Sequence, residues 1–175
     1  IVDPTPATRI IAVQSGALPN WKGVTYSPFN LVTPTVVTNP VLKASDITGV
    51  SARFVADTFL FYESNTWYMF TEIYNNSNNQ GDLTVATTPD GLHWNYQQIV
   101  LNETWHLSYP YIFKFNGMYY MIPETYKITE IRLYKATNFP TTWSYVATLV
   151  SGRDFVDSSI FRYNGKWWMF TSDTT

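Results

Sequence analysis

The sequence predicts an all-β protein made of consecutive four-stranded antiparallel blades of a β-propeller, and the set of blades in this chain is incomplete. Aromatic residues make up 18% of the chain and charged residues only 14%, a composition that favours pleated, half-buried strands. A hairpin pattern recurs with a period of about fifty residues. The two full repeats each contain four short apolar runs separated by turn signals, which is the content of a propeller blade.

The first half of each repeat is a hairpin of two aromatic runs. Asn116-Gly117 and Asn164-Gly165 supply the pair of positive φ angles that a two-residue hairpin loop needs. In the first copy the turn reads Ser64-Asn65-Thr66, for which we expect a longer or bulged loop. The copies read FLFYESNTWYMF from residue 59, YIFKFNGMYYMI from residue 111 and SIFRYNGKWWMF from residue 159.

The second half of each full repeat is another strand, turn and strand. The two copies read LTVATTPDGLHWNY at 83–96 and LYKATNFPTTWSY at 133–145. Pro-Asp-Gly in the first and Phe-Pro in the second mark the chain reversals, and Trp94 and Trp143 begin the returning strands.

These repeats divide the chain into four regions. We assign a Pro-rich leader with short strands to 1–51, blade one to 52–102, blade two to 103–153 and the first half of blade three to 154–175. Within the leader, Thr35 to Thr38 and Val41 to Lys43 are candidate strands. A propeller closes with four to eight blades. We therefore expect a parent chain to supply the remaining blades.

Aligning the repeats places a set of acids at one end of the blades. Asp57, Tyr109 and Asp157 share the start of the first strand, whereas Glu72 and Glu124 share the end of the second. Carboxylates that hydrogen-bond hydroxyls and aromatic rings that stack on sugars suit a carbohydrate site at this channel mouth. The candidate sugar-binding residues are Glu72, Trp105, His106, Tyr109, Glu124 and Asp173. Alternatively, the acids accept backbone N–H groups at turns as a repeated structural device.

Composition excludes several other functions. A net charge of −2 without a basic block argues against nucleic acid as a partner. The sequence has no apolar run long enough for a membrane span, and with 2 His and no Cys we expect no metal site and no cofactor. The sequons at Asn75 and Asn102 predict N-glycosylation in exposed loops. They favour the lumen of the secretory pathway or an extracellular location.

Several strings together resemble a known family. They are FVADTF from Phe54, GDLTVA from Gly81, WHLSYPYIF from Trp105, MIPET from Met121, EIRLYKATNFPTTW from Glu130, VDSS from Val156 and Ser172-Asp173. Their order resembles the N-terminal domain of glucosamine inositolphosphorylceramide transferases, from about Asn39 to the end of the chain. That domain in turn resembles the five-bladed propellers of glycoside hydrolase family 43.

The resemblance implies roles for two of the acids. Asp57 resembles the general base of those hydrolases and Asp157 the acid-tuning residue, so both are candidate catalytic residues, although Thr58 stands where the hydrolases have Pro. Their general acid would lie beyond Thr175. The resemblance also implies a separate C-terminal transferase domain in the parent chain, and a carbohydrate or glycolipid as partner.

Three functions follow from the sequence, and it leaves open whether the chain is an enzyme. The first is a carbohydrate-binding propeller that is accessory to glycosyl transfer onto a glycoconjugate. The second is a glycoside hydrolase of the furanosidase type, with Asp57 as base. The third is a structural, extracellular assembly module in which the aromatic residues serve only as core.

Overall fold

The computed structural model describes residues 35–174, which contain three antiparallel sheets. The first has the strand order β1 (Ala52–Glu63), β2 (Thr66–Asn75), β3 (Gln80–Thr88) and β4 (Asn95–Leu101). The second has the order β5 (Ser108–Phe115), β6 (Met118–Glu124), β7 (Glu130–Asn138) and β8 (Thr142–Ser151). The third pairs β9 (Phe155–Tyr163) with β10 (Lys166–Asp173). The predicted fold of consecutive antiparallel four-stranded blades is confirmed.

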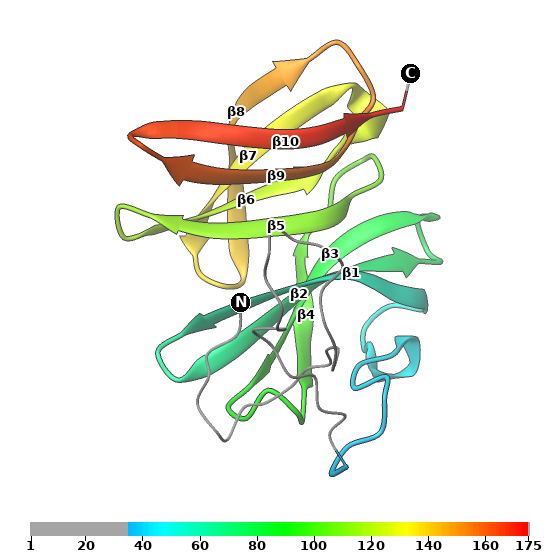
Figure 1. Cartoon of the computed structure of the whole chain (residues 1–175). Helices are drawn as coiled ribbons and strands as arrows, with labels where there is room; N and C mark the ends of the chain where they lie inside the picture. Colours follow the sequence, from blue (N-terminus) through cyan, green and yellow to red (C-terminus); the bar gives the residue numbers. More distant parts are fainter. Residues whose placement is uncertain (1–34, 175) are drawn as a thin grey trace, which may run out of the picture.

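In Figure 1 the first sheet occupies the lower half of the view and the other two sheets the upper half, with β9 and β10 drawn between β5 and β8 of the second sheet. The first strands of the sheets lie near each other, because rings of β1 and β5 are in contact and Tyr111 on β5 donates a hydrogen bond to the carbonyl of Ile160 on β9. β1, β5 and β9 are therefore the inner strands of the assembly.

The inner hairpins turn as their sequences predict, with one exception. Asn116 and Gly117 have φ of 49° and 76°, and Asn164 and Gly165 have φ of 50° and 77°, so both pairs form the expected two-residue loops. The prediction of a longer or bulged loop in the first copy is wrong. Ser64 and Asn65 also have positive φ, of 50° and 60°, and Glu63 pairs directly with Thr66. Two positive φ angles suffice for this turn, and Asn and Ser reach them without Gly.

The main core lies between the first two sheets. Phe70 and Leu83 from the first sheet are fully buried against Met121 and Tyr134 from the second, which are 0% and 1% exposed. Trp143 closes the outer part of this core, where its ring meets that of Phe70 edge to face. Because both sheets contribute large apolar side chains to one interface, each stabilises the other.

The opposite face of the first sheet is covered by residues that precede β1. Leu42 packs against Met69 and Ala86, and Ile47 is 7% exposed. A short 3₁₀ helix, η1 (Ala44–Asp46), lies in this segment. The candidate strands at Thr35 to Thr38 and Val41 to Lys43 do not form, and the other leader residues, 1–34, lie outside the described residues.

Candidate functional site

Each inner strand contains one residue in the left-handed backbone region, and the three occur at the equivalent position of the repeat. Asp57, Tyr109 and Asp157 have φ of 50°, 46° and 54°. At each of them the strand pairing slips, which is the signature of a β-bulge. A left-handed conformation costs a residue other than Gly about 1 kcal/mol or more. Bulges at three equivalent strand starts aim these residues away from the regular ladder, toward one end of the blades.

The predicted acids of this end lie together, and we call Asp57, Glu72, Glu124 and Asp157 the acidic cluster. Asp57 Oδ2 accepts a hydrogen bond of 3.2 Å from the backbone N–H of Tyr109, and the charge of Asp57 acts on the Glu72 carboxyl. Glu124 Oε2 accepts one of 3.1 Å from the backbone N–H of Asp157. Each blade is therefore linked to the next through a carboxylate and the amide of a bulge residue.

The hydrogen bonds that Glu124 makes in the second blade are not repeated by its equivalent in the first blade. Glu124 lies opposite Ser108, whose hydroxyl donates to Oε1 at 2.9 Å. Glu72 is the equivalent residue, but it lies opposite Ala56, which has no hydroxyl to donate. The amide that Glu72 could bind by analogy, that of Tyr109, is taken by Asp57. Glu72 Oε1 is consequently buried without a hydrogen-bond partner among the described residues.

His106 is the nearest polar group to this orphaned oxygen. Its Nε2 lies 3.4 Å from Glu72 Oε1, while its Nδ1 accepts a 2.9 Å hydrogen bond from the backbone N–H of Gly81. With Nδ1 as acceptor, the neutral ring carries its proton on Nε2, facing Glu72. Gly81 permits this contact, because a Cβ there would lie 2.7 Å from Glu72 Oε1 and 2.8 Å from His106 Cε1.

The surroundings of Glu72, Glu124 and His106 favour the uncharged form of each side chain. Burial and the negative charges of Asp57 and Glu124 raise the pKa of Glu72 to about 7. Burial also raises the pKa of Glu124, although its bonds from Asp157 and Ser108 oppose the rise. Burial and the charge of Lys127 lower the pKa of His106. Near pH 7, Glu72 is thus a half-protonated acid.

This environment predicts a pH-dependent stability. Since the folded-state pKa of Glu72 is about 7 and the unfolded value is 4.5, the folded state holds the proton more tightly between these values. The contribution of Glu72 to the free energy of unfolding therefore falls as pH rises from 4.5 to 7, by up to about 3 kcal/mol. Glu72→Gln cannot ionise, so its stability relative to the unsubstituted protein is expected to rise by that amount between pH 5 and pH 8 in urea denaturation.

A matched control for this experiment is Glu63→Gln at the other end of β1. Glu63 forms an ion pair of 2.9 Å with Lys114 at the surface, which is worth less than about 1 kcal/mol. The difference in free energy of unfolding between Glu63→Gln and the unsubstituted protein is expected to stay constant across the same pH range. Equal pH profiles for the two variants would contradict the raised pKa of Glu72.

Two further residues predicted for this site, Trp105 and Asp173, contact residues outside the acidic cluster. Trp105 packs against the main core, with the guanidinium of Arg132 4.9 Å from its ring centre, and its buried Nε1 has no hydrogen-bond partner among the described residues. Asp173 forms an ion pair with Arg153 at the end of β10. His106, Tyr109 and the four acids thus come together, whereas Trp105 lies in the core.

The two predicted glycosylation sites differ in exposure. Asn102 is exposed between β4 and β5, so glycosylation there stays a prediction. Asn75 does not lie in the exposed loop that we expected, because it ends β2, is 4% exposed, and donates from Nδ2 to Asp82 at 2.8 Å. A glycan on Nδ2 would replace this buried hydrogen bond.

Sequence reasoning missed Gly81 and Ser108 as parts of the site. A glycine inside a strand signals a close approach of another segment, and Gly81 in β3 carried that signal. Ser108 carried none, because a single serine at a strand start is common. Within 35–174 no three His, Asp or Glu side chains are arranged to hold a metal ion, and no helix is long and apolar enough to cross a membrane.

Solved structures with a similar fold define the class of protein. A Bacillus subtilis arabinanase aligns with a TM-score of 0.54 at 18% identity, covering 71% of this chain and 50% of that one. A Bombyx mori β-fructofuranosidase of glycoside hydrolase family 32 aligns with a TM-score of 0.55 at 17% identity, covering 75% and 31%. Both are five-bladed β-propeller enzymes. At this identity the likeness shows the fold alone, so the chain is built of β-propeller blades.

The family follows from sequence similarity. A family model described as glucosamine inositolphosphorylceramide transferase 1, N-terminal, matches residues 30–175. The transferase of this name from Oryza sativa subsp. indica is 44% identical over 142 residues, covering 79% of this chain and 19% of the relative. The one from Arabidopsis thaliana is 39% identical over 142 residues, covering 79% and 18%. The chain belongs to the glucosamine inositolphosphorylceramide transferase N-terminal family and spans about a fifth of the length of these relatives.

Proposed function

We propose that this propeller is a carbohydrate-binding unit that assists glycosyl transfer onto a glycolipid, and that its acidic cluster contacts the sugar. The family supports the reaction class, because its relatives are named as transferases that act with glucosamine and inositolphosphorylceramide. The geometry supports the site, because three bulges at equivalent positions turn Asp57, Tyr109 and Asp157 toward one end of the blades.

The observation that carries the proposal is the pairing of two exposed acids with two shielded ones. Asp57 and Asp157 are exposed, whereas Glu72 is 5% exposed and Glu124 is half-buried. Exposed carboxylates accept hydrogen bonds from sugar hydroxyls or from an amino group. Of the shielded acids, Glu124 fixes the amide of the bulge residue Asp157. The ring of Tyr109, which packs edge to face on Phe59, supplies an apolar surface beside them.

The geometry gives less support to hydrolysis by Asp57 and Glu72. The two carboxyls of a retaining glycosidase stand about 5 Å apart on either side of the scissile bond. Glu72 is only 5% exposed, and the charge of Asp57 acts on it directly, so Glu72 is poorly placed to meet a sugar as the second carboxyl. The fold alone does not imply hydrolase activity, and the described residues favour binding.

The test is a titration of the isotope-labelled protein with D-glucosamine and with myo-inositol phosphate, followed by amide NMR. Binding at millimolar concentration is expected to shift the amides of Asp57, Tyr109 and Asp157. Asp57→Asn removes one charged acceptor and is expected to weaken binding about tenfold, which is about 1.4 kcal/mol.

Glu63→Gln again serves as the control, because it changes an acid of the same strand far from the cluster. Its affinity is expected to equal that of the unsubstituted protein. If neither sugar shifts the three bulge amides, or if both variants bind with equal affinity, the acidic cluster is a structural device and the proposal fails.

A further inference from the structure

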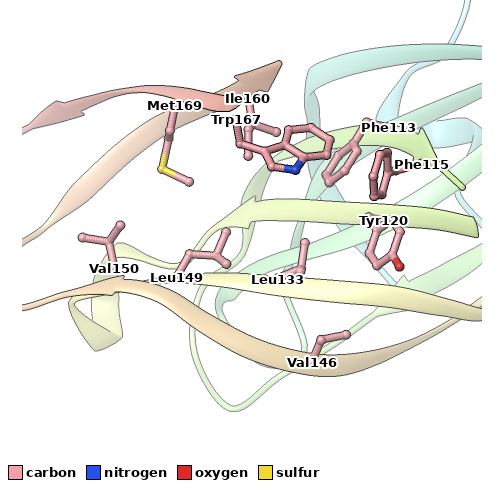
Figure 2. Close-up of a pocket in the computed structure, with 10 residues that line it drawn as sticks. All are labelled: Phe113, Phe115, Tyr120, Leu133, Val146, Leu149, Val150, Ile160, Trp167 and Met169. Atoms are coloured by element: carbon pink, nitrogen blue, oxygen red, sulfur yellow. The ribbon is translucent and has the colours of Figure 1, made fainter. Parts of the chain in front are cut away.

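The acidic cluster has no counter-charge. Among residues 35–174, Asp57, Glu124 and Asp157 form no ion pair, and Glu72 approaches only His106. The apolar space between the second sheet and the pair β9 and β10 differs, because all 10 residues drawn around it in Figure 2 are uncharged. A site that gathers carboxyls without a lysine or arginine favours a ligand that brings a positive charge.

A buried oxygen within the cluster points to the same kind of ligand. Glu72 is 5% exposed, and its Oε1 has no hydrogen-bond partner among the described residues. A carboxylate that is buried without a donor is costly to ionise, whereas the protonated carboxyl avoids most of this cost. Glu72 therefore tends to keep its proton as long as no positive charge enters the site.

His106 is placed to stabilise the Glu72 carboxylate once the proton has left. Its Nε2 lies 3.4 Å from Glu72 Oε1, and its Nδ1 is anchored by the backbone N–H of Gly81 at 2.9 Å. Closing the first distance to about 2.8 Å would give a charge-assisted hydrogen bond. Burial and the charge of Lys127 lower the pKa of His106, so the ring donates an N–H but does not supply the missing positive charge.

The other groups around the pair of Glu72 and His106 are mainly acids. They are Asp57 on β1, Asp82 on β3, Glu124 on β6, Asp157 on β9, and Lys127 on the short 3₁₀ helix η2 (Tyr126–Ile128). Ionisation of Glu72 adds a negative charge to surroundings that already oppose it. A cation bound beside Asp57 would reduce this opposition, because it attracts the new carboxylate.

We propose that the acidic cluster exchanges a proton for a cationic sugar. When the ammonium group of an amino sugar binds beside Asp57, Glu72 releases its proton to solvent, and the resulting carboxylate accepts a hydrogen bond from His106 Nε2. No covalent bond between heavy atoms changes, and one positive charge enters the site as another leaves. The inference rests on the sugar binding proposed above. It adds that the site prefers a protonated amine to a neutral sugar, and that binding is linked to proton release.

The test follows the side-chain carboxyl carbon of Glu72 by ¹³C NMR in protein labelled at glutamate, with Glu72→Gln to identify the resonance. The pKa of Glu72, about 7 in the free protein, is expected to fall by about one unit when D-glucosamine saturates the amide shifts of Asp57 and Tyr109. By linkage this equals about tenfold tighter binding to the ionised form. N-acetyl-D-glucosamine at the same concentration has no positive charge and is expected to leave the pKa unchanged. The Glu63 resonance is the internal control, and neither sugar is expected to move its midpoint.

Substitutions of His106 test its part in the exchange. His106→Phe removes the N–H donor, so the pKa of Glu72 is expected to rise by about one unit in the free and the sugar-bound protein. His106→Gln keeps a side-chain N–H and is expected to restore most of this shift. An unchanged pKa of Glu72 in His106→Phe would overturn the role of His106.

The sugar titrations separate failure of the exchange from failure of the binding site. Shifts of the Asp57 and Tyr109 amides without a change in the pKa of Glu72 would overturn the exchange and leave sugar binding intact. An equal fall of the pKa with both sugars would also overturn it, because the charge of the ligand would not be responsible. If neither sugar shifts these amides, the sugar site and the exchange that depends on it both fail.

Discussion

Phe70→Ala is expected to lower the free energy of unfolding by about 4 kcal/mol. The ring of Phe70 is 0% exposed, lies in the core between the first two sheets and contacts Trp143 with a centroid distance of 5.9 Å. Its removal leaves a cavity between sheets that cannot collapse without parting the strands. Urea denaturation followed by tryptophan fluorescence measures the loss.

The repeat supplies an unusually close control for this substitution. Phe170 occupies the position of Phe70 in the third unit, on the same kind of strand, but it is 61% exposed and stacks only on Phe161. Phe170→Ala is expected to cost less than about 1 kcal/mol. Equal losses at the two positions would show that burial between the first two sheets is not what makes Phe70 stabilising.

Gly81→Ala is expected to cost about 4 kcal/mol. The added Cβ would lie 2.2 Å from the backbone oxygen of Leu107, and a carbonyl in a fixed strand connection cannot move aside cheaply. The shift would also break the hydrogen bonds from Gly81 N–H to His106 and from Leu107 N–H to Gly81. Thermal and urea denaturation both report the loss.

A second glycine separates the effect of crowding from that of backbone strain. Gly117 has a φ of +76°, but nothing lies within 4 Å of an added Cβ. Gly117→Ala is therefore expected to cost about 1 kcal/mol, from the left-handed conformation alone. If Gly81→Ala is no worse than Gly117→Ala, the backbone at Leu107 moves aside easily and the site around Glu72 is looser than the structure indicates.

The period of the sequence was sufficient to predict the fold and to align its units. Asn-Gly pairs located two inner hairpins, and the alignment placed Asp57, Tyr109 and Asp157 at one position before any geometry was known. The structure gives all three the same left-handed bulge. Such agreement arises because backbone geometry repeats with the blade, so one correct register aligns every unit.

The environment of Glu72 could not be predicted, because it depends on the one place where the repeat fails. Ala56 replaces the serine found opposite Glu124, and Asp57 takes the amide that Glu72 would otherwise bind. Burial and pKa follow from such cross-blade contacts, which join residues about thirty to fifty positions apart and leave no local pattern. The approach of His106 to Glu72 is of the same kind.

Trp105 and Asn75 were assigned to exposed positions because their residue types suggested a function there. A tryptophan beside a histidine fits a sugar platform, and a sequon after a strand fits an exposed loop, but each residue type also serves a core. Trp105 packs under Arg132, and Asn75 binds the fully buried Asp82. Local sequence does not distinguish these roles, because it does not say which face of a strand end another segment covers.

The carboxylate links between blades give the chain a direction of assembly. Asp57 holds an amide of the following blade, Glu124 holds an amide of the unit after it, and the core of the first sheet closes only when the second is in place. Each of the first two blades is thus completed by sequence that leaves the ribosome later than itself. A nascent chain of this kind always presents one unfinished face during synthesis, and chaperones that shield apolar sheets would meet the same surface once per blade.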